Sequence, residues 1–297
     1  MVPSIEKIVA RLPTGASAAK GPTAVLTGDQ IVHFRREGFL SLPKITTDEE
    51  IDFLRGLYDR LFETRAGWKD GNYLDFVGAD DTAPARLPQI LMPSLYEPAF
   101  KETLIYSNCH AIAKQLLGPM AEFAFDHATL KPAGGGPQTP WHQDQAFYEA
   151  GTTYYAITFW VPLQPVTRES GCLRFVPQSN NGPLLKHQPL NNDPRVHGLE
   201  ALGVDETDTI YCPLNAGEAT VHHYMTLHGA DANLSDESRR AYALGFGVKL
   251  AEPLVRREYA WNKGKKTPHE LRLRSSLSPW RRLKRKVRGG LVKFGLY

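Results

Sequence analysis

The hydrophobic pattern of this chain changes once, near the turn Gly118-Pro119. Before the turn, apolar residues recur with helical spacing. After it, short β-rich runs are separated by turn residues. We expect strands at residues 122–131, 155–162, 172–177, 218–224 and 241–250. Helices first and many short strands afterwards indicate an α+β, mainly β chain that is built on an all-β barrel or sandwich.

Capping residues place the helices that precede the strands. Thr27 and Gln30 have the spacing of a capping box, and Gly38 is placed to end the helix that they open. Thr47 and Glu50 repeat the capping box before a second helix. The expected order is a helix ending at 38, a strand at 39–42, a helix reaching about 64, an irregular segment at 67–98 and a helix over roughly 98–117.

Composition is that of a soluble globular protein. Of the 297 residues, 23% are charged and 42% are apolar, which is ordinary for this class. No apolar run reaches the roughly 20 residues that cross a bilayer, and we expect no secretory signal. Three widely spaced cysteines, Cys109, Cys172 and Cys212, argue against a disulfide framework and against structural zinc. We therefore expect a cytoplasmic protein.

The charge of the chain is unevenly distributed. The net charge is +3, yet residues 271–297 hold nine Lys and Arg and no Asp or Glu, which leaves 26 basic against 32 acidic residues elsewhere. Residues 278–288 have the pattern of a basic helix. We expect a solvated tail that is electrostatically separate from the rest. Contact with an anionic membrane surface, a nucleic acid or an acidic partner are the alternatives.

The motif His142-Gln143-Asp144 carries the main chemical signal. On an extended segment, side chains two residues apart point the same way. Together with a distant imidazole, His228, they would form the facial triad of two histidines and one carboxylate that non-haem iron(II) oxygenases use. A regular strand from 221 to 228 would place His222 on the face of His228 and His223 on the other. Both stay open as competing third ligands.

Several segments resemble one known family. They are His142-Gln143-Asp144 followed by Trp160, Ser170-Gly171-Cys172-Leu173-Arg174-Phe175-Val176-Pro177, Leu227-His228-Gly229-Ala230-Asp231-Ala232-Asn233-Leu234-Ser235 with Arg239-Arg240-Ala241, and the early Arg36-Glu37-Gly38-Phe39. Together they resemble the phytanoyl-CoA dioxygenase family of iron(II)/2-oxoglutarate-dependent oxygenases. The resemblance spans about residues 25–250. We therefore expect a loose lead-in at 1–24, a single dioxygenase domain at 25–250 and a C-terminal extension with the basic tail at 251–297.

The resemblance implies a fold and a set of site residues. The fold is a double-stranded β-helix, a jelly-roll, cupin-like barrel with flanking N-terminal helices. The iron ligands fall on His142, Asp144 and His228. The arginine that binds 2-oxoglutarate falls on Arg239, because it lies eleven residues after the second histidine, and Arg240 is the competing choice. Further 2-oxoglutarate contacts are expected from Trp160, from His127, and from Thr158 on the strand face of Trp160. Ala230 departs from the serine that is frequent in the family.

The implied activity is hydroxylation of an aliphatic carbon in a small organic substrate, such as a biosynthetic intermediate. Iron(II) is the cofactor, 2-oxoglutarate and O2 are co-substrates, and succinate and CO2 are released. The carboxylate of Asp144 disfavours halogenation, since halogenating relatives replace it with Gly or Ala. Desaturation, epimerisation or ring formation at the same iron site are alternatives, as is a non-catalytic jelly-roll metal- or ligand-binding protein. We expect no nucleic-acid substrate. The sequence leaves the oligomeric state open.

The substrate side is the least determined part of the sequence. Residues 73–98, with Arg86 and Gln89, and residues 180–209 are candidate lids over the barrel mouth. Ordinary surface loops are the alternative for both. Lys131 precedes Pro132 and three glycines, and it is expected either to contact an anionic substrate or to be solvated.

Overall fold

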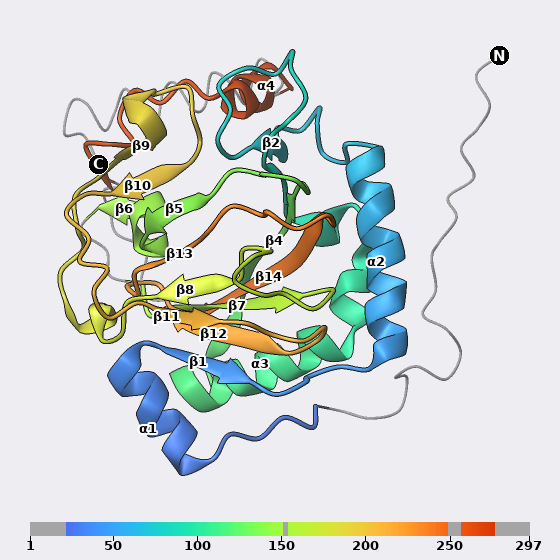
Figure 1. The fold of residues 1–297 in the computed structure, drawn as a ribbon, viewed down its shortest axis with the longest axis vertical. Helices are drawn as coiled ribbons and strands as arrows, with labels where there is room; N and C mark the ends of the chain where they lie inside the picture. The colour runs from blue at the N-terminus through green and yellow to red at the C-terminus, as the bar shows by residue number, and fades with distance from the viewer. Residues whose placement is uncertain (1–21, 151–153, 249–256, 277–297) are drawn as a thin grey trace.

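Two antiparallel sheets face each other in the computed structural model, which describes residues 22–150, 154–248 and 257–276 (Figure 1). The larger sheet has seven strands in the order β1-β12-β7-β14-β4-β3-β2, and the smaller has four in the order β11-β8-β13-β5. In the larger sheet these are Phe39–Leu42, Ala219–His223, Ala156–Pro162, Arg239–Val248, Ala121–Lys131, Pro88–Leu91 and Tyr73–Asp75. In the smaller sheet they are Ile210–Cys212, Leu173–Phe175, His228–Ala230 and Thr139–His142.

This architecture confirms the expected jelly-roll class with flanking helices. Among the described strands, however, the two sheets are not hydrogen-bonded into one closed barrel. Two additional strand pairs lie beside them, β9 (His187–Pro189) with β10 (Leu199–Ala201) and β6 (Glu149–Ala150) with β15 (Arg257–Glu258).

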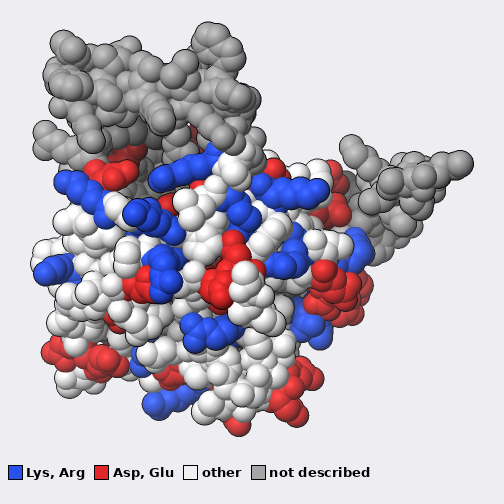
Figure 2. Space-filling model, turned by 90° about the horizontal axis from the view of Figure 1, so that it is seen from above, with Lys and Arg blue, Asp and Glu red and all other residues white. Residues whose placement is uncertain are grey.

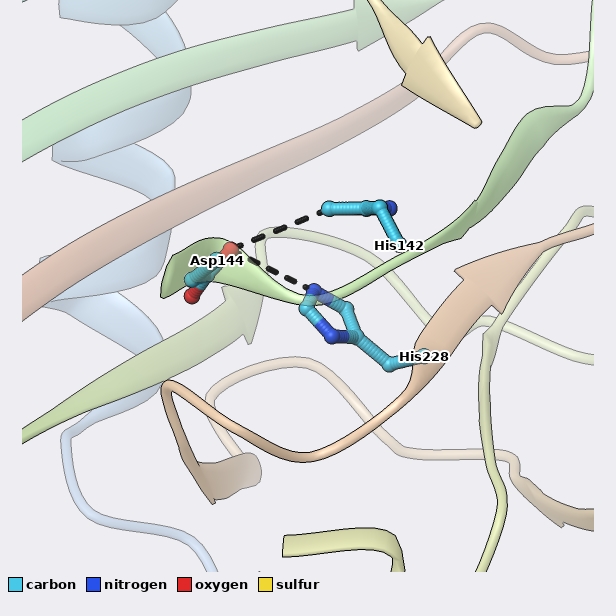
Figure 3. A group of neighbouring side chains, drawn as sticks. All are labelled: His142, Asp144 and His228. Carbon is cyan, nitrogen blue, oxygen red and sulfur yellow. Dashed lines mark ion pairs between the residues drawn. The ribbon is translucent and has the colours of Figure 1, made fainter. Parts of the chain in front are cut away.

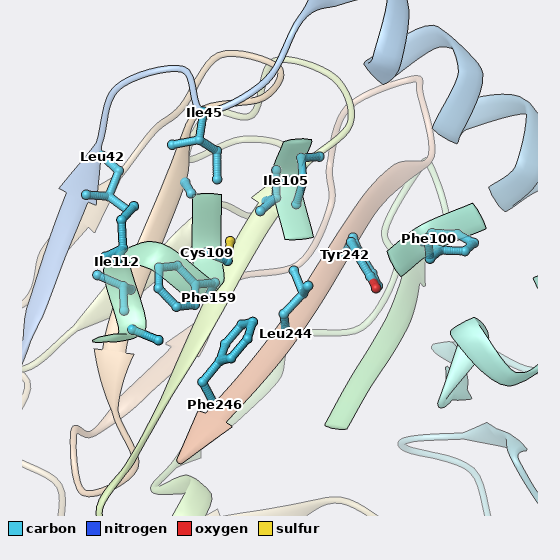
Figure 4. Close-up of a cluster of buried hydrophobic side chains, with 14 of the residues drawn as sticks. Leu42, Ile45, Phe100, Ile105, Cys109, Ile112, Phe159, Tyr242, Leu244 and Phe246 are labelled. Atoms are coloured by element: carbon cyan, nitrogen blue, oxygen red, sulfur yellow. The ribbon is translucent and has the colours of Figure 1, made fainter. Parts of the chain in front are cut away.

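Side-chain alternation along β7 separates the hydrophobic core from the functional interior. Ile157, Phe159 and Val161 pack in a hydrophobic core together with residues of the helices. Figure 4 shows part of this core, including Phe159. The intervening Thr158 and Trp160 face the smaller sheet, where Trp160 joins a second cluster with residues of β8 and β11. The period of two therefore gives one strand a helix-packed face and a site-facing face.

Four α-helices flank the sheets in the described part of the chain: α1 (Gly28–Glu37), α2 (Asp48–Glu63), α3 (Leu104–Leu117) and α4 (Pro268–Ser276). Short 3₁₀ helices are η1 (Pro93–Leu95), η2 (Pro98–Glu102), η3 (Asp144–Phe147), η4 (Ser179–Asn181) and η5 (Leu190–Asn192). The capping box at Thr27 and Gln30 is confirmed, and Gly38 ends α1 with a positive φ of 82°. The third helix begins at Leu104, later than expected, because residues 98–102 form η2.

Glu50 corrects the expected second capping box. Thr47 caps α2 by accepting a hydrogen bond from the amide of Glu50. The Glu50 carboxylate does not return this bond, because it is turned toward another helix. It accepts hydrogen bonds from the amides of Leu104 and Ile105 and from the hydroxyl of Thr46. Glu50 therefore joins the start of α3 to α2.

Two other expectations need correction. The segment at 67–98 is not wholly irregular, since it contains β2 and β3, which extend the larger sheet beside β4. The regular strand expected from 221 to 228 is broken. β12 ends at His223, a turn follows, and His228 begins β13 in the other sheet. The chain crosses between the sheets at this turn.

The chain ends lie partly outside the described residues. Residues 1–21 of the lead-in expected at 1–24 and the expected basic helix at 278–288 fall there. Within the described part, no helix is both long enough and apolar enough for a membrane crossing. No pattern in the sequence predicted α4, which lies beside β2 in Figure 1.

Candidate active site

His142, Asp144 and His228 converge between the two sheets (Figure 3). One ligand atom from each lies within 4.8 Å of the others. Oδ1 of Asp144 is 3.8 Å from Nε2 of His142 and 3.6 Å from Nε2 of His228. The two histidines are direct cross-strand partners of β5 and β13. Two imidazoles and one carboxylate on one side of a point form the donor set of a facial iron(II) site.

The local backbone explains why His142 and Asp144 point the same way. β5 ends at His142, and Asp144 opens η3, so the two do not share one strand. Gln143 between them nevertheless has extended angles, φ −115° and ψ 131°, which preserves the alternation. Its side chain turns the other way, is fully buried, and bonds to the carbonyls of Pro183 and Met225 and to the amide of Leu185.

Hydrogen bonds orient both imidazoles toward a common centre. Nδ1 of His142 lies 2.8 Å from the carbonyl of Pro140, and Nδ1 of His228 lies 2.9 Å from the carbonyl of Thr226. A carbonyl only accepts, so each Nδ1 carries the proton and each Nε2 keeps a free lone pair. Burial lowers the pKa of both histidines to about 4. Both rings are therefore neutral near neutral pH, as metal ligation requires.

Asp144 is ionised despite its buried position. Burial by itself raises the pKa of its carboxyl, but the neighbouring imidazoles of His228, His222 and His142 together hold the pKa well below its usual range. An anionic carboxylate with two neutral imidazoles is the protonation state in which all three can bind a divalent cation.

Of the two competing ligands, His222 lies at the site and His223 turns away. Nε2 of His222 is 3.4 Å from Oδ2 of Asp144, the oxygen that does not face the other two histidines. Nδ1 of His223 accepts a hydrogen bond from the amide of Met225 in the turn after β12. The strand break explains how His222 and His228 approach Asp144 from different sheets.

Arg239 has an environment that fits a bound carboxylate. It is 3% exposed, and within the described part of the chain its Nε and Nη1 have no hydrogen-bond partner. Its guanidinium lies 5.0 Å from the centre of the Trp160 ring. Burial lowers the pKa of Arg239 to about 10, so it stays charged near neutral pH. A buried, charged and unpaired fork is costly unless an anion binds to it.

Two further basic side chains lie near Arg239. Lys131 is fully buried, and its ammonium donates to the carbonyls of Asp231 and Ala230 at 2.5 and 3.4 Å. The expectation that it is solvated is therefore wrong. Burial lowers its pKa well below the usual value, and the charges of Arg239 and Arg174 add to this effect. The sequence assigned no role to Arg174, although it lies in the motif at 170–177.

Arg240 points away from this group. Its Nε and Nη2 bond to both oxygens of Asp59, at 2.6 and 3.1 Å. Adjacent strand residues face opposite sides of β14, so only one of the two arginines reaches the interior. His127 lies close enough to Asp144 and His142 for their charges to act on it, and burial lowers its pKa to about 4. Thr158 donates a hydrogen bond to Oδ2 of Asp144 at 2.7 Å.

Aromatic side chains surround His142 on its other side. Phe76 and Phe147 lie 6.4 and 5.8 Å from its ring centre. His197 stacks on Phe147 at 5.6 Å, and His269 of α4 contacts His197 at 4.8 Å. Burial lowers the pKa of His197 well below its usual value and that of His269 to about 4. The four rings of this aromatic wall are therefore uncharged, although the ammonium of Lys265 lies 5.7 Å from the centre of the Phe147 ring.

The C-terminal extension packs directly against this wall. Trp261 and Asn262 both donate to the carbonyl of Ala146 in η3. Lys265 donates to the carbonyl of His197, which lies in the candidate lid at 180–209. The guanidinium of Arg272 bonds to the carbonyl of Trp68 and lies 3.6 Å from the centre of the Trp68 ring. The extension thus connects η3, the segment at 180–209 and the segment at Trp68.

Both candidate lids contribute ordered structure to the site. In the first, Arg86 donates to the carbonyl of Val77 and Gln89 lies buried on β3. In the second, Nε2 of His187 accepts a hydrogen bond from the amide of Gln143. Neither segment is an ordinary surface loop. The first contributes strands β2 and β3 to the larger sheet, and the second bonds to Gln143, which lies between two residues of the triad.

The comparison with known families decides what kind of protein contains this site. The family model for phytanoyl-CoA dioxygenase (PhyH) matches residues 34–241. The chain belongs to the phytanoyl-CoA dioxygenase family. Membership confirms the expected class, a non-haem iron dioxygenase that depends on iron(II), 2-oxoglutarate and O2.

Individual relatives agree with this assignment. A probable alpha-ketoglutarate-dependent hypophosphite dioxygenase of Stutzerimonas stutzeri is 27% identical over 57% of this chain and 60% of its own length, so the chain spans less than two thirds of that relative. The crystal structure of EvdO2 from Micromonospora carbonacea var. aurantiaca with 2-oxoglutarate matches with a TM-score of 0.68 and 33% identity, over 82% of this chain and 99% of that one. SnoK, a non-haem alpha-ketoglutarate-dependent carbocyclase from nogalamycin biosynthesis, has a TM-score of 0.65 at 20% identity over 88% and 95%, which shows the shared fold.

Proposed function

We propose that this chain hydroxylates an aliphatic carbon of a small organic molecule. In this proposal His142, Asp144 and His228 bind iron(II), and Arg239 binds the distal carboxylate of 2-oxoglutarate. One observation carries it: a converging triad and a buried arginine with unpaired N–H groups face the same interior. The crystal structure of EvdO2, 33% identical, contains 2-oxoglutarate, which supports a co-substrate site in this fold.

Each of these residues would have a different role in the reaction. Iron(II), when bound, supplies the oxidation in which O2 converts 2-oxoglutarate to succinate and CO2 and a substrate C–H to C–OH. The two Nε2 lone pairs and Oδ1 of Asp144 hold the metal on one side and leave the other side open. Arg239 fixes 2-oxoglutarate through a charged fork, against Trp160. Lys131, whose pKa burial lowers, and Arg174, which pairs with Asp231 at 3.1 Å, lie at the same end.

The substrate would approach along the aromatic wall beside His142. Phe76, Phe147, His197 and His269 offer ring faces and neutral imidazoles rather than charges. A substrate with apolar carbon and hydroxyl groups fits these ring faces. On the face that Figure 2 shows, Lys and Arg are interspersed with Asp and Glu. An intermixed surface of this kind favours a small molecule over a nucleic acid.

Other outcomes of the same site form the second candidate function. SnoK shares the fold and is named a carbocyclase, so fold alone leaves ring formation, epimerisation and desaturation as alternatives to hydroxylation. The carboxylate of Asp144 supports hydroxylation over halogenation, since a halogenating site needs room for chloride at that position. A non-catalytic binding protein is disfavoured, because it would have no need for both the triad and the unpaired Arg239.

The same reasoning extends to organisation and location. We propose one dioxygenase domain over 25–250 and a C-terminal extension at 251–297, whose described residues 257–276 complete the substrate side. The contacts of Trp261, Lys265 and Arg272 support this role. The free cysteines Cys109, Cys172 and Cys212 are all buried, which is consistent with a reducing, cytoplasmic setting.

Succinate release tests the proposed function. The purified chain is supplied with iron(II), ascorbate, O2 and isotopically labelled 2-oxoglutarate, and a panel of hydroxylated and apolar small molecules is screened for those that stimulate succinate formation. Asp144→Ala should lower the rate at least about 100-fold, since two protein ligands remain. His33→Ala, on the partly exposed face of α1, is the matched control and should keep the rate. Wild-type succinate release by Asp144→Ala, or none from the wild type, would contradict the proposal.

A further inference from the structure

The two oxygens of Asp144 have different surroundings. Oδ1 faces the Nε2 atoms of His142 and His228, at 3.8 and 3.6 Å. Oδ2 faces away from them, toward the hydroxyl of Thr158 at 2.7 Å and Nε2 of His222 at 3.4 Å. Two side chains that can donate therefore lie on the oxygen that does not face the other two triad members.

The two donors come from one place in the larger sheet. Thr158 on β7 and His222 on β12 are direct cross-strand partners, so their side chains emerge side by side on one face. The histidines of the triad, His142 and His228, are likewise cross-strand partners, but in the smaller sheet. Asp144 thus lies between two residue pairs, one from each sheet. The pair from the smaller sheet faces Oδ1, and the pair from the larger sheet faces Oδ2.

His222 has little else to bond to. It is 2% exposed, and among the described residues neither ring nitrogen has a partner of standard hydrogen-bond geometry. Its ring packs between Phe175 at 5.4 Å and His228 at 4.2 Å. A buried ring N–H without an acceptor is unfavourable. Nε2 lies 3.4 Å from Oδ2 of Asp144, so a small rotation of the ring would give it this acceptor.

We propose that Thr158 and His222 form a clamp that holds Oδ2 of Asp144, so that only Oδ1 is presented to the iron. Both are positioning residues that act through Asp144. A carboxylate that rotated to offer both oxygens would occupy a second position at the metal. By preventing this rotation, the clamp keeps the open positions free for 2-oxoglutarate and O2. This inference rests on the proposed function of the triad and deepens it.

His142 and His228 are oriented by hydrogen bonds to backbone carbonyls. In the clamp, by contrast, two side chains orient Asp144. Carboxylate ligands are normally held by hydrogen bonds, and loss of such a partner typically weakens metal binding 10–100-fold. Because the donors and the histidine ligands belong to opposite sheets, the clamp also couples the spacing of the sheets to the site. A shift of β12 relative to β13 would move His222 off Oδ2.

Anaerobic iron(II) titration with 2-oxoglutarate tests the clamp without a substrate. Binding is followed by the weak visible charge-transfer band, and the dissociation constant and band position are recorded. Thr158→Val removes the hydroxyl at nearly constant volume, and His222→Phe removes the ring N–H. Each should weaken iron binding 10–100-fold and change the band. Thr158→Ser restores the hydroxyl and should return the dissociation constant to within about threefold of the wild type.

Thr220→Val is the matched control. Thr220 lies on β12, two residues before His222, and its buried hydroxyl has no partner within the described chain. This variant should bind iron like the wild type. Thermal melting of each metal-free variant identifies any that fails to fold, and if His222→Phe does, the comparison of Val with Ser at position 158 decides.

The outcomes separate the clamp from the proposed function. If the wild type gives no iron- and 2-oxoglutarate-dependent band, the proposed function fails. If the wild type gives the band and Thr158→Val and His222→Phe match it, only the clamp is overturned. The clamp is also overturned if Thr158→Ser is as weak as Thr158→Val. If His222→Phe abolishes binding while His228→Ala retains it, His222 is a ligand and the clamp is wrong.

Discussion

At the residue scale, neighbouring side chains of the same type have different tasks because strand geometry separates them. Arg239 and Arg240 are adjacent, yet one is buried over Trp160 with unpaired N–H groups and the other bonds to Asp59. His222 and His223 divide in the same way, toward Asp144 and away from it. In both pairs, the alternation of β14 and β12 decides which side chain faces the interior.

This division predicts different effects of the same substitution at the two arginines. Arg239→Gln should raise the KM for 2-oxoglutarate about 10–100-fold, because charge-assisted hydrogen bonds to a buried carboxylate are lost. Arg240→Gln should leave that KM within about twofold, because it removes only a partly exposed ion pair. Succinate formation at varied 2-oxoglutarate measures both. A large effect confined to Arg240→Gln would transfer the role to Arg240.

At the element scale, buried polar side chains connect elements that the sequence presents as independent. Glu50 belongs to α2 but caps α3. Gln143 lies between two candidate ligands but anchors the segment at 183–185 and the turn at Met225. Such bonds fix how helices and loops sit around the sheets, and hence the geometry of the site.

The role of Glu50 can be measured as stability. Glu50→Ala leaves the amides of Leu104 and Ile105 buried without their acceptor, and we expect the free energy of unfolding to fall by about 2–4 kcal/mol. Asp52→Ala, on the exposed face of the same helix, should change it by less than about 0.5 kcal/mol. Urea unfolding followed by circular dichroism compares them. Equal stability of the two variants would mean that the cap is unimportant.

The docking of α4 gives a second prediction at this scale. Arg272 packs on Trp68 and bonds to the carbonyls of Trp68 and Tyr73 and to Asp81. Arg272→Ala should therefore speed amide hydrogen exchange in residues 268–275 and in β2, because local opening becomes easier. Arg274→Ala, exposed on the same helix, should not. Unchanged exchange in Arg272→Ala would show that other contacts suffice to dock the extension.

Local signals in the sequence predicted individual helices and strands, but they did not predict the long-range contacts between them. The strand at 39–42 and the capping box at Thr27 follow from residues a few positions apart, and the structure has both. The break after His223 could not be predicted, because an alternating pattern reads the same whether or not the chain changes sheets. The burial of Lys131 could not be predicted either, since its partners are carbonyls about 100 residues away.

At the scale of the whole molecule, the site lies where the two sheets meet. The smaller sheet contributes the pair His142 and His228, whereas the larger sheet contributes Arg239 and Trp160. The motif His142-Gln143-Asp144 and the family resemblance together predicted that His142, Asp144 and His228 lie close to one another, as they do in the structure. The contribution of each sheet, and the packing of the extension on the site, depend on tertiary pairing that no local pattern records.

Binding of metal between the sheets should stabilise the entire domain. With iron(II) alone at about 100 times its dissociation constant, mass action adds about 2.7 kcal/mol, which corresponds to a rise in Tm of several degrees for a chain of this size. Chelation should reverse the rise. Anaerobic calorimetry measures it, and His142→Ala should show none. An equal rise in His142→Ala would place the stabilising metal elsewhere.

Diffraction at the iron absorption edge tests the central claim most directly. Crystals grown anaerobically with iron(II) and 2-oxoglutarate should show one anomalous peak about 2.0–2.2 Å from Nε2 of His142, Nε2 of His228 and Oδ1 of Asp144, with a carboxylate on the guanidinium of Arg239. A peak that excludes any of these three atoms, or 2-oxoglutarate bound away from Arg239, would contradict the account.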